Sequence, residues 1–303
     1  MSSKLAPLLN EIRDDTENGA ATLTNRALDV FAQFAESIPE TGWDETGAFR
    51  RLVVRVHDLR PSMGAIGVMA LLVYDRVVSR PATRDRPLKS AVREAVSFYR
   101  ALMGEADARI SAVAVDILGE RRVIATCSYS STLMSAFRCL SPSKIMVGDG
   151  APLNDGVRTA EALCKRDINV TLAPDGAIPS LAEQADVVVL GADQILLSGA
   201  VINRAGSFPL ALAASHYGIP VYILCHSIKV SGIADDDATI ERLSADGFRY
   251  PAGIDVDVPL FDVTPASLIS GVISENGLLK RNDIEVLSYR LSDIRRNMIL
   301  CVQ

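Results

Sequence analysis

The chain has 303 residues, a formal charge of −6 at pH 7 and a hydrophobic fraction of 49%. This length accommodates two domains around a large buried core, and the composition is typical of an α/β enzyme. The acidic charge argues against a nucleic-acid partner, because binding a phosphate backbone normally needs a basic face. Charged residues interrupt the N-terminal segment, and no later segment is long and uncharged enough to cross a bilayer. We therefore expect a cytoplasmic protein without a membrane partner.

The cysteines and histidines show neither the pattern of a disulfide framework nor that of a metal site. The five cysteines are odd in number and form no Cys-x-x-Cys pair, which predicts reduced thiols, most of them in the core. The three histidines lack the paired spacing of a zinc-binding helix. Gly148-Asp149-Gly150 lacks the third glycine of a dinucleotide fingerprint, which favours a plain strand-to-helix turn. We expect neither a metal nor a redox cofactor.

Residues 5–104 have the periodicity of helices. Leu23, Ala27, Phe31 and Phe34 recur at three- and four-residue spacing, which predicts an amphipathic helix. Residues 63–78 form a further apolar segment, rich in small residues that allow close packing. The sequence therefore predicts an N-terminal helical domain, which we assign to residues 1–107.

Downstream, short apolar runs alternate with helical stretches. This rhythm predicts βαβ units and a mainly parallel, Rossmann-like sheet in residues 108–303. The predicted fold class is therefore α/β, with a helical N-terminal domain ahead of a Rossmann-like domain. The predicted strands are Val123-Ile124-Ala125, Ile145-Met146-Val147, Val170-Thr171-Leu172, Val187 to Leu190 and Val221 to Leu224.

Asp193 follows the most apolar of these strands, after Gly191 and Ala192. Ligands bind at the carboxyl ends of parallel strands, so this carboxylate lies where chemistry is expected. A carboxyl group at that place can move protons at the oxygens of a sugar. The alternative is that Asp193 caps a helix or binds backbone amides.

A small polar run follows the first predicted strand. Ser128, Ser130 and Ser131 stand at the start of a predicted helix, where hydroxyl and backbone N–H groups can bind a phosphate. Helix capping is the alternative, and one serine can do both. Cys127 is either a catalytic thiol or a buried core residue, and the residues alone leave both interpretations open.

Several longer motifs carry a family resemblance. The chain resembles a superfamily of ribose-1,5-bisphosphate isomerases, methylthioribose-1-phosphate isomerases and the alpha, beta and delta regulatory subunits of eukaryotic translation initiation factor 2B. The resemblance covers most of the chain. Its motifs are Gly191-Ala192-Asp193, the turn Gly199 to Gly206, the segments Phe208 to Ala214 and His216 to Tyr222, Phe261-Asp262-Val263-Thr264-Pro265, and Ile273-Ser274-Glu275-Asn276-Gly277.

The resemblance implies that Asp193 is catalytic and that a cysteine acts beside it. The isomerases have Thr-His-Cys at the strand end where this chain has Thr126-Cys127-Ser128. Aligning on Thr126 places Ser128 at the catalytic cysteine, whereas aligning on the cysteine makes Cys127 catalytic. A serine hydroxyl is a much weaker acid and nucleophile than a thiol, so the two alignments predict different chemistry.

The resemblance also implies phosphate ligands. Arg60, in Arg60-Pro61-Ser62, and the pair Asn203-Arg204 match positions that contact the substrate, with a polar turn as the alternative for Asn203. Asp149 stands at the end of its predicted strand, where it either binds a hydroxyl group or holds the loop turn. Two positions depart from the pattern, because Asn18 and Ala151 stand where the family typically has arginine.

Three functions follow as expectations. The first is aldose–ketose isomerisation of a phosphorylated pentose or related sugar by a homodimer that joins through its C-terminal domain. The second is a non-catalytic protein that senses a sugar phosphate or nucleotide or supports assembly, as the regulatory subunits do. The third is a pocket redirected to a different phosphorylated metabolite.

Overall fold

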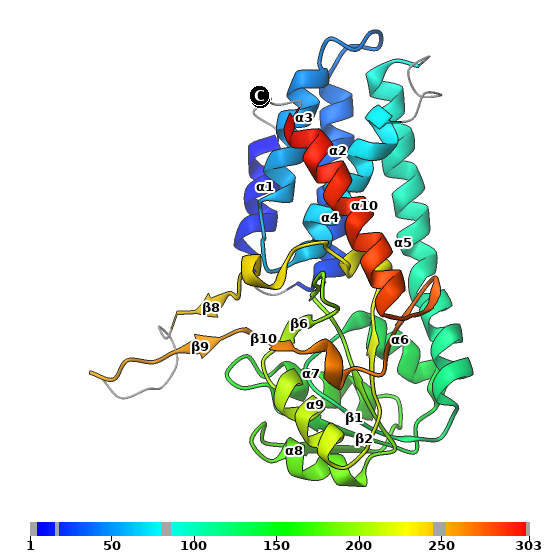
Figure 1. Cartoon of the computed structure of the whole chain (residues 1–303), viewed down its shortest axis with the longest axis vertical. Helices are drawn as coiled ribbons and strands as arrows, with labels where there is room; N and C mark the ends of the chain where they lie inside the picture. The colour runs from blue at the N-terminus through cyan, green and yellow to red at the C-terminus, as the bar shows by residue number, and fades with distance from the viewer. Residues whose placement is uncertain (1–4, 16–17, 80–85, 245–252, 301–303) are drawn as a thin grey trace.

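The structure is a computed structural model that describes residues 5–15, 18–79, 86–244 and 253–300. The described residues before position 119 form a bundle of α-helices (Figure 1). Among the residues that the structure describes, no helix is long and apolar enough to cross a membrane. The helices of the bundle are α1 (Leu5–Asp14), α2 (Ala20–Ser37), α3 (Thr46–His57), α4 (Gly64–Tyr74), which continues as the π-helix η1 (Asp75–Ser79), and α5 (Leu88–Leu118).

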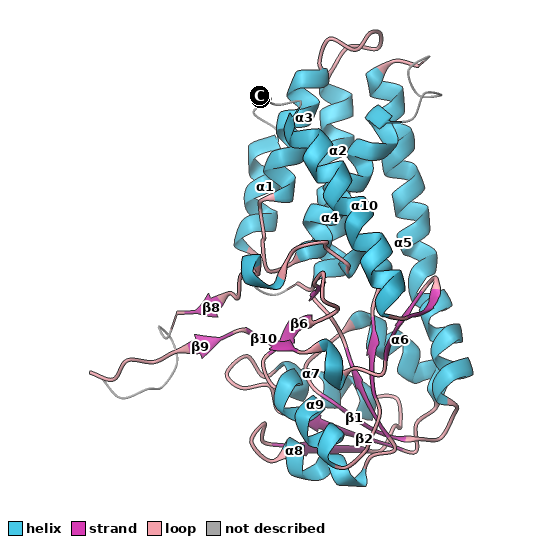
Figure 2. Cartoon of the chain, in the orientation of Figure 1, coloured by secondary structure: helices cyan, strands magenta, loops and turns pink. Residues whose placement is uncertain are grey.

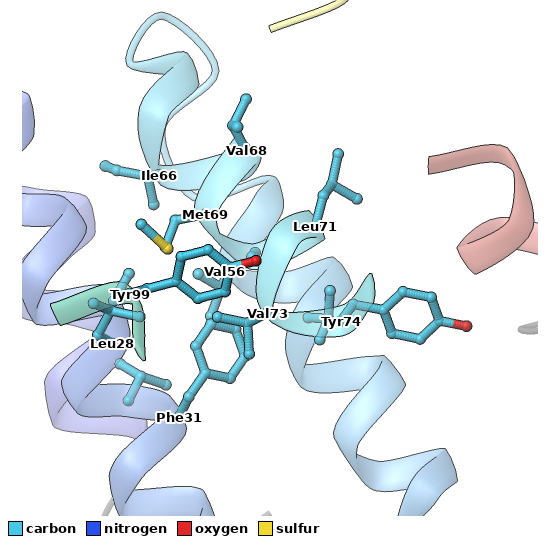
Figure 3. Packing of buried hydrophobic residues seen from close by; sticks show 14 of the residues in the cluster. Leu28, Phe31, Val56, Ile66, Val68, Met69, Leu71, Val73, Tyr74 and Tyr99 are labelled. Carbon is cyan, nitrogen blue, oxygen red and sulfur yellow. The ribbon is translucent and has the colours of Figure 1, made fainter. Parts of the chain in front are cut away.

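The core of this bundle is built around α4. This helix is apolar on all its faces, as expected for a helix with packed neighbours on every side. It contacts α2, α3 and α5, and Figure 3 shows Ile66, Met69 and Val73 of α4 among Phe31 and Tyr99 of neighbouring helices. The helical periodicity predicted for α2 is confirmed, since Leu23, Ala27, Phe31 and Phe34 are all buried.

A seven-stranded sheet follows, in the order β12-β11-β7-β4-β1-β2-β3. Its neighbouring strands are parallel except for β11 and β12, so the predicted fold class is confirmed. The strands are β1 (Val123–Thr126), β2 (Lys144–Gly148), β3 (Val170–Ala173), β4 (Val187–Leu190), β7 (Val221–Leu224), β11 (Gly271–Ser274) and β12 (Gly277–Leu279).

The strand order reverses between β1 and β4. From β1 the chain proceeds outward to β2 and β3, and then returns to place β4 on the other side of β1. In an open α/β sheet the crevice outside the carboxyl ends of the strands at such a reversal is the usual ligand site. In Figure 2 the helical bundle lies above the sheet. The remaining helices are α6 (Ser131–Leu140), α7 (Asp155–Cys164), α8 (Ile178–Leu181), α9 (Ser207–His216) and α10 (Arg281–Leu300).

Smaller sheets connect the two layers. An antiparallel sheet of β5 (Gln194–Ile195), β6 (Val201–Arg204) and β10 (Phe261–Thr264) follows the Asp193 loop. Ile202 and Phe261 of this sheet are buried in the core of the helical bundle. A second pair, β8 (Arg242–Leu243) and β9 (Val258–Pro259), extends to one side in Figure 1.

Two helices join the layers across the predicted division at residues 107 and 108. Helix α5 runs through this position without interruption. Helix α10 returns from the end of the chain, and its Leu291, Ile294 and Met298 are buried in the core of the helical bundle (Figure 1). The helical layer therefore includes a C-terminal helix, while the two-domain division stays a prediction.

Gly156→Ala is expected to destabilise the fold by about 3 kcal/mol, because it overpacks a backbone contact. Gly156 lies in the first turn of α7, and a Cβ atom there would meet the carbonyl oxygen of Gly148 at 1.6 Å. Gly104→Ala in α5 is the control, since a Cβ atom there meets nothing within 4 Å. The control should stabilise the helix by about 1 kcal/mol. Equal unfolding midpoints of the two variants in denaturant would contradict this close contact.

Candidate active site

A cavity of about 230 Å³ lies where the helical bundle meets the carboxyl ends of the central strands. Its sheet-side walls are the loops after β1, β4 and β7 together with part of β6. Its other wall comes from the beginnings of α2 and α4. The side chains of the lining that carry polar, charged or thiol groups include those of Asn18, Ser128, Ser130, Ser131, Asp155, Arg158, Asp193, Asn203, Arg204, Cys225, His226 and Lys229.

Asp193 lines the cavity, three residues beyond the end of β4. Its backbone N–H donates to the carbonyl oxygen of Ile202 at 2.8 Å, which fixes the loop against β6. Burial raises the pKa of the Asp193 carboxyl group, and the positive charges of Lys229 and Arg204 oppose that rise. The Nζ of Lys229 lies 3.9 Å from Oδ1 of Asp193. This carboxyl group can therefore hold and release a proton inside the cavity.

The cavity also contains cations. Arg204 lies at the end of β6, and its Nε forms an ion pair with Oδ2 of Asp155 at 2.9 Å. The buried Nη1 of Arg204 has no hydrogen-bond partner among the described residues. The guanidinium of Arg158 lies 4.2 Å from the centre of the Tyr129 ring. With Lys229, these side chains make the cavity suitable for an anion.

The beginnings of three helices also favour an anion in this cavity. Helices α2, α4 and α6 all begin at the cavity, and the positive ends of helix dipoles stabilise negative charge. Ser130 caps α6, because its Oγ accepts from the backbone N–H of Leu133 at 3.4 Å. Ser130 and Ser131 line the cavity, so the capping and ligand-binding interpretations are compatible for Ser130.

The structure separates Cys127 from Ser128. Ser128 lines the cavity and has a left-handed backbone, with φ of 61°. Cys127 is buried in the hydrophobic core, with its Sγ 3.2 Å from Oγ of Ser207. Burial raises the pKa of the Cys127 thiol to about 12, so this group stays protonated. Ser128, and not Cys127, therefore lies beside the Asp193 cavity.

Asn203 and Asp149 have different surroundings. Asn203 lines the cavity, and its Nδ2 donates to Oγ of Ser207 at 2.8 Å. Asp149 lies outside the lining of the cavity and holds the loop after β2. Its Oδ1 accepts from the backbone N–H of Asp175 at 3.1 Å, and its carbonyl oxygen accepts from the N–H of Gly156.

The initiation factor 2 subunit family model matches residues 16–281, which is most of the chain. The chain belongs to this family. It is 26% identical to a translation initiation factor eIF-2B subunit 2-like protein of Pyrococcus abyssi, over 92% of this chain and 97% of the relative. It is also 27% identical to ribose 1,5-bisphosphate isomerase of Haloterrigena turkmenica, over 86% of this chain and 85% of that protein.

A methylthioribose-1-phosphate isomerase of Gemmatimonas aurantiaca is 32% identical, over 65% of each chain. The crystal structure of Pyrococcus horikoshii translation initiation factor eIF-2B matches the fold with a TM-score of 0.79 and 23% identity. That match covers 92% of this chain and 98% of the other. The predicted superfamily is thus confirmed, and its members include both isomerases and initiation factor subunits.

In this family member Arg60 lies outside the Asp193 cavity. Its guanidinium donates to both carboxylate oxygens of Glu241, at 3.2 and 3.0 Å, and to the carbonyl oxygen of Asp15 at 2.6 Å. The Arg60 side chain is only 8% exposed, so these bonds occupy a buried group. Its position favours a structural role over the predicted phosphate contact.

Arg60→Gln is expected to lower the free energy of unfolding by about 3 kcal/mol, because it leaves Glu241 without its buried partner. Affinity for a sugar phosphate should stay within about fivefold of the wild-type value, since fivefold corresponds to about 1 kcal/mol. Chemical denaturation measures the first quantity and calorimetric titration the second. A large loss of affinity with unchanged stability would instead assign Arg60 to the phosphate.

Several cavity residues were not predicted from the sequence. Cys225, His226 and Lys229 lie on and just before η4 (Ser227–Lys229), the short helix that follows β7, and Asp155 begins α7. Burial raises the pKa of the Cys225 thiol to about 12. The available signal was the end of a parallel strand, because the segment after Val221 to Leu224 occupies the same kind of position as Asp193.

Proposed function

We propose that this protein isomerises a phosphorylated pentose or related sugar from an aldose to a ketose in the Asp193 cavity. The observation that carries the proposal is a half-buried carboxyl group of raised pKa beside Lys229 and Arg204, at the strand reversal of the sheet. The relatives named as isomerases support the same chemistry.

The reaction needs proton movements at carbon and at oxygen. For a sugar 1-phosphate, a base takes the hydrogen from C2 and its electron pair forms a C1–C2 double bond. The ring C1–O bond breaks, and the ring oxygen takes the proton of the Asp193 carboxyl group. The C2 hydroxyl group then returns a proton to Asp193 as it becomes a ketone, while C1 takes a proton from the base. Arg204, Lys229 and the start of α6 hold the phosphate, and Asn203 orients a hydroxyl group.

A second candidate is a sensor that binds the sugar phosphate without converting it. The buried position of Cys127 and the serine at position 128 favour it, because they leave the cavity without the reactive thiol that the resemblance implies. The relatives named as initiation factor subunits support this candidate. A cavity that takes a different phosphorylated metabolite is the third.

Thermal unfolding with ligands tests the binding part of the proposal. Ribose 1,5-bisphosphate and 5-methylthioribose 1-phosphate should each be measured against unphosphorylated ribose as the matched control. A ligand at 100 times its dissociation constant stabilises the fold by about 2.7 kcal/mol, which raises the unfolding temperature measurably. If no sugar phosphate stabilises the protein beyond ribose, the cavity is not a sugar-phosphate site.

We further propose that the protein is a cytoplasmic homodimer. The described cysteines are all free, which suits a reducing compartment. Phe208 and Leu212 lie one turn apart on the exposed face of α9, in the part of the chain expected to form the interface. Light scattering on the purified protein would give a monomer mass if this assignment is wrong.

A further inference from the structure

His226, a buried residue of the cavity lining, forms a pair with the partly exposed Asp107. Its Nε2 lies 2.9 Å from Oδ1 of Asp107, a residue of α5. The same Oδ1 accepts from Oγ1 of Thr132 at 2.9 Å, so residues from α5, α6 and the loop after β7 meet at one carboxylate. The His226 side chain is 7% exposed, whereas that of Asp107 is 37% exposed.

This pairing fixes the orientation of the imidazole ring. The hydrogen bond from His226 lowers the pKa of the Asp107 carboxyl group, so Asp107 is an ionised acceptor. Nε2 therefore carries the hydrogen, and a neutral ring has its lone pair on Nδ1. Among the described residues Nδ1 has no hydrogen-bond partner, and His226 lines the cavity that contains Asp193.

The isomerisation needs a group that acts at carbon. Cys127 is buried outside the cavity, the Cys225 thiol stays protonated, and the Ser128 hydroxyl group is a weak base. Lys229 is paired with Asp193, and Arg158 and Arg204 are permanent cations. Among the described residues that line the cavity, the His226 imidazole is best suited to accept a proton from carbon, because Asp107 holds its Nε2 and leaves its Nδ1 unbonded.

We propose that His226 is the catalytic base that moves the proton between C2 and C1, and that Asp107 is a positioning residue that holds its ring. This assignment rests on the proposed isomerase function. Nδ1 takes the C2 hydrogen as a proton while the C1–C2 double bond forms, and the ring becomes an imidazolium. Nδ1 then gives a proton to C1 as the C2 hydroxyl group becomes the ketone. Asp193 gives its proton to the ring oxygen and takes one back from the C2 hydroxyl group, so both residues end in the protonation states in which they began.

The groups around His226 explain how the cation is stabilised. Asp107 faces the ring from α5, and Asp193 and Asp155 are carboxyl groups of the same cavity. Lys229, Arg158 and Arg204 supply positive charge at the cavity and oppose the imidazolium. The direct hydrogen bond to Asp107 offsets that repulsion at the moment of proton transfer.

The test uses the full-length protein and follows isomerisation of ribose 1,5-bisphosphate and 5-methylthioribose 1-phosphate by NMR in D₂O. His226→Gln and His226→Ala should lower kcat by about 100-fold, and both should suppress deuterium incorporation at C1 of the product. Added imidazole should restore part of the rate of His226→Ala. Asp107→Asn should lower kcat more than it changes KM. His216→Gln, an exposed histidine at the end of α9, is the matched control and should behave as the wild type.

Different failures have different meanings. A wild-type protein that converts neither sugar overturns the proposed function and this assignment together. A wild-type protein that turns over while His226→Gln keeps its rate and its deuterium incorporation overturns only the role of His226. A slow His226→Ala variant with a lowered unfolding temperature and no response to imidazole also overturns it, because those results describe a structural contact.

Discussion

Asp193→Asn is expected to lower kcat by about 10³-fold, while the variant still binds its sugar phosphate. An amide has nearly the shape of the carboxyl group but cannot give a proton to the ring oxygen or take one from the C2 hydroxyl group. The effect should fall on kcat because binding depends mainly on the cations and the helix beginnings. Turnover assays by NMR and thermal unfolding with ligand measure the two parts separately.

The raised pKa of Asp193 gives this prediction a pH dependence. Burial favours the protonated carboxyl group of Asp193, so the folded protein binds this proton more tightly than the unfolded chain does. The contribution of Asp193 to stability therefore falls as pH rises, and Asp193→Asn should remove that fall. Asp116→Asn, an exposed position on α5, is the control and should leave rate and stability unchanged. A fully active Asp193→Asn variant would remove this residue from the mechanism.

Arg204→Gln is expected to weaken binding of a sugar phosphate by about 100-fold, or about 3 kcal/mol. The guanidinium is held by Asp155 through Nε, and its buried Nη1 has no hydrogen-bond partner in the described part of the chain, so that nitrogen is available to an anionic oxygen. A phosphate is also attracted by the charge itself, which glutamine lacks. Calorimetric titration of wild type and variant gives the difference directly.

The control for Arg204 must separate affinity from stability. Arg204→Gln leaves the Asp155 carboxylate without its cationic partner. A double variant that carries Asp155→Asn as well removes this unpaired charge, because both side chains are then neutral amides. The double variant should regain stability without regaining affinity. Arg109→Gln removes an exposed arginine that pairs with Glu105 on the surface of α5, and it should change neither quantity. Unchanged affinity in Arg204→Gln would place the phosphate elsewhere.

The sequence was sufficient for most of the fold. Strands such as Val187 to Leu190 are buried on both faces of a parallel sheet, so an uninterrupted apolar run marks them. The periodicity of Leu23, Ala27 and Phe31 marks one buried face of α2. The place of α10 was not predictable, because a helix packs against whichever apolar surface is free, and its partner α4 lies more than 200 residues earlier in the chain.

The candidate site was predictable only in part. Asp193 and Arg204 lie near strand ends that the residue pattern identifies, and the structure places both at one cavity. Arg60 also matched a family motif, but its motif gave no sign of Glu241, which lies 181 positions away in the chain. The pairing of His226 with Asp107 could not be predicted either, because these residues are 119 positions apart and meet only through the packing of α5 against the loop after β7. Local patterns identify strand ends, whereas long-range ion pairs are fixed by tertiary packing.

Catalytic conversion in the Asp193 cavity is tested most directly by ³¹P and ¹³C NMR of ribose 1,5-bisphosphate and 5-methylthioribose 1-phosphate incubated with wild type and with Asp193→Asn. We predict that at least one sugar phosphate becomes its ketose with the wild type and persists unchanged with the variant. A sugar phosphate that stabilises both proteins and is converted by neither would contradict the isomerase function and would assign the cavity to sensing.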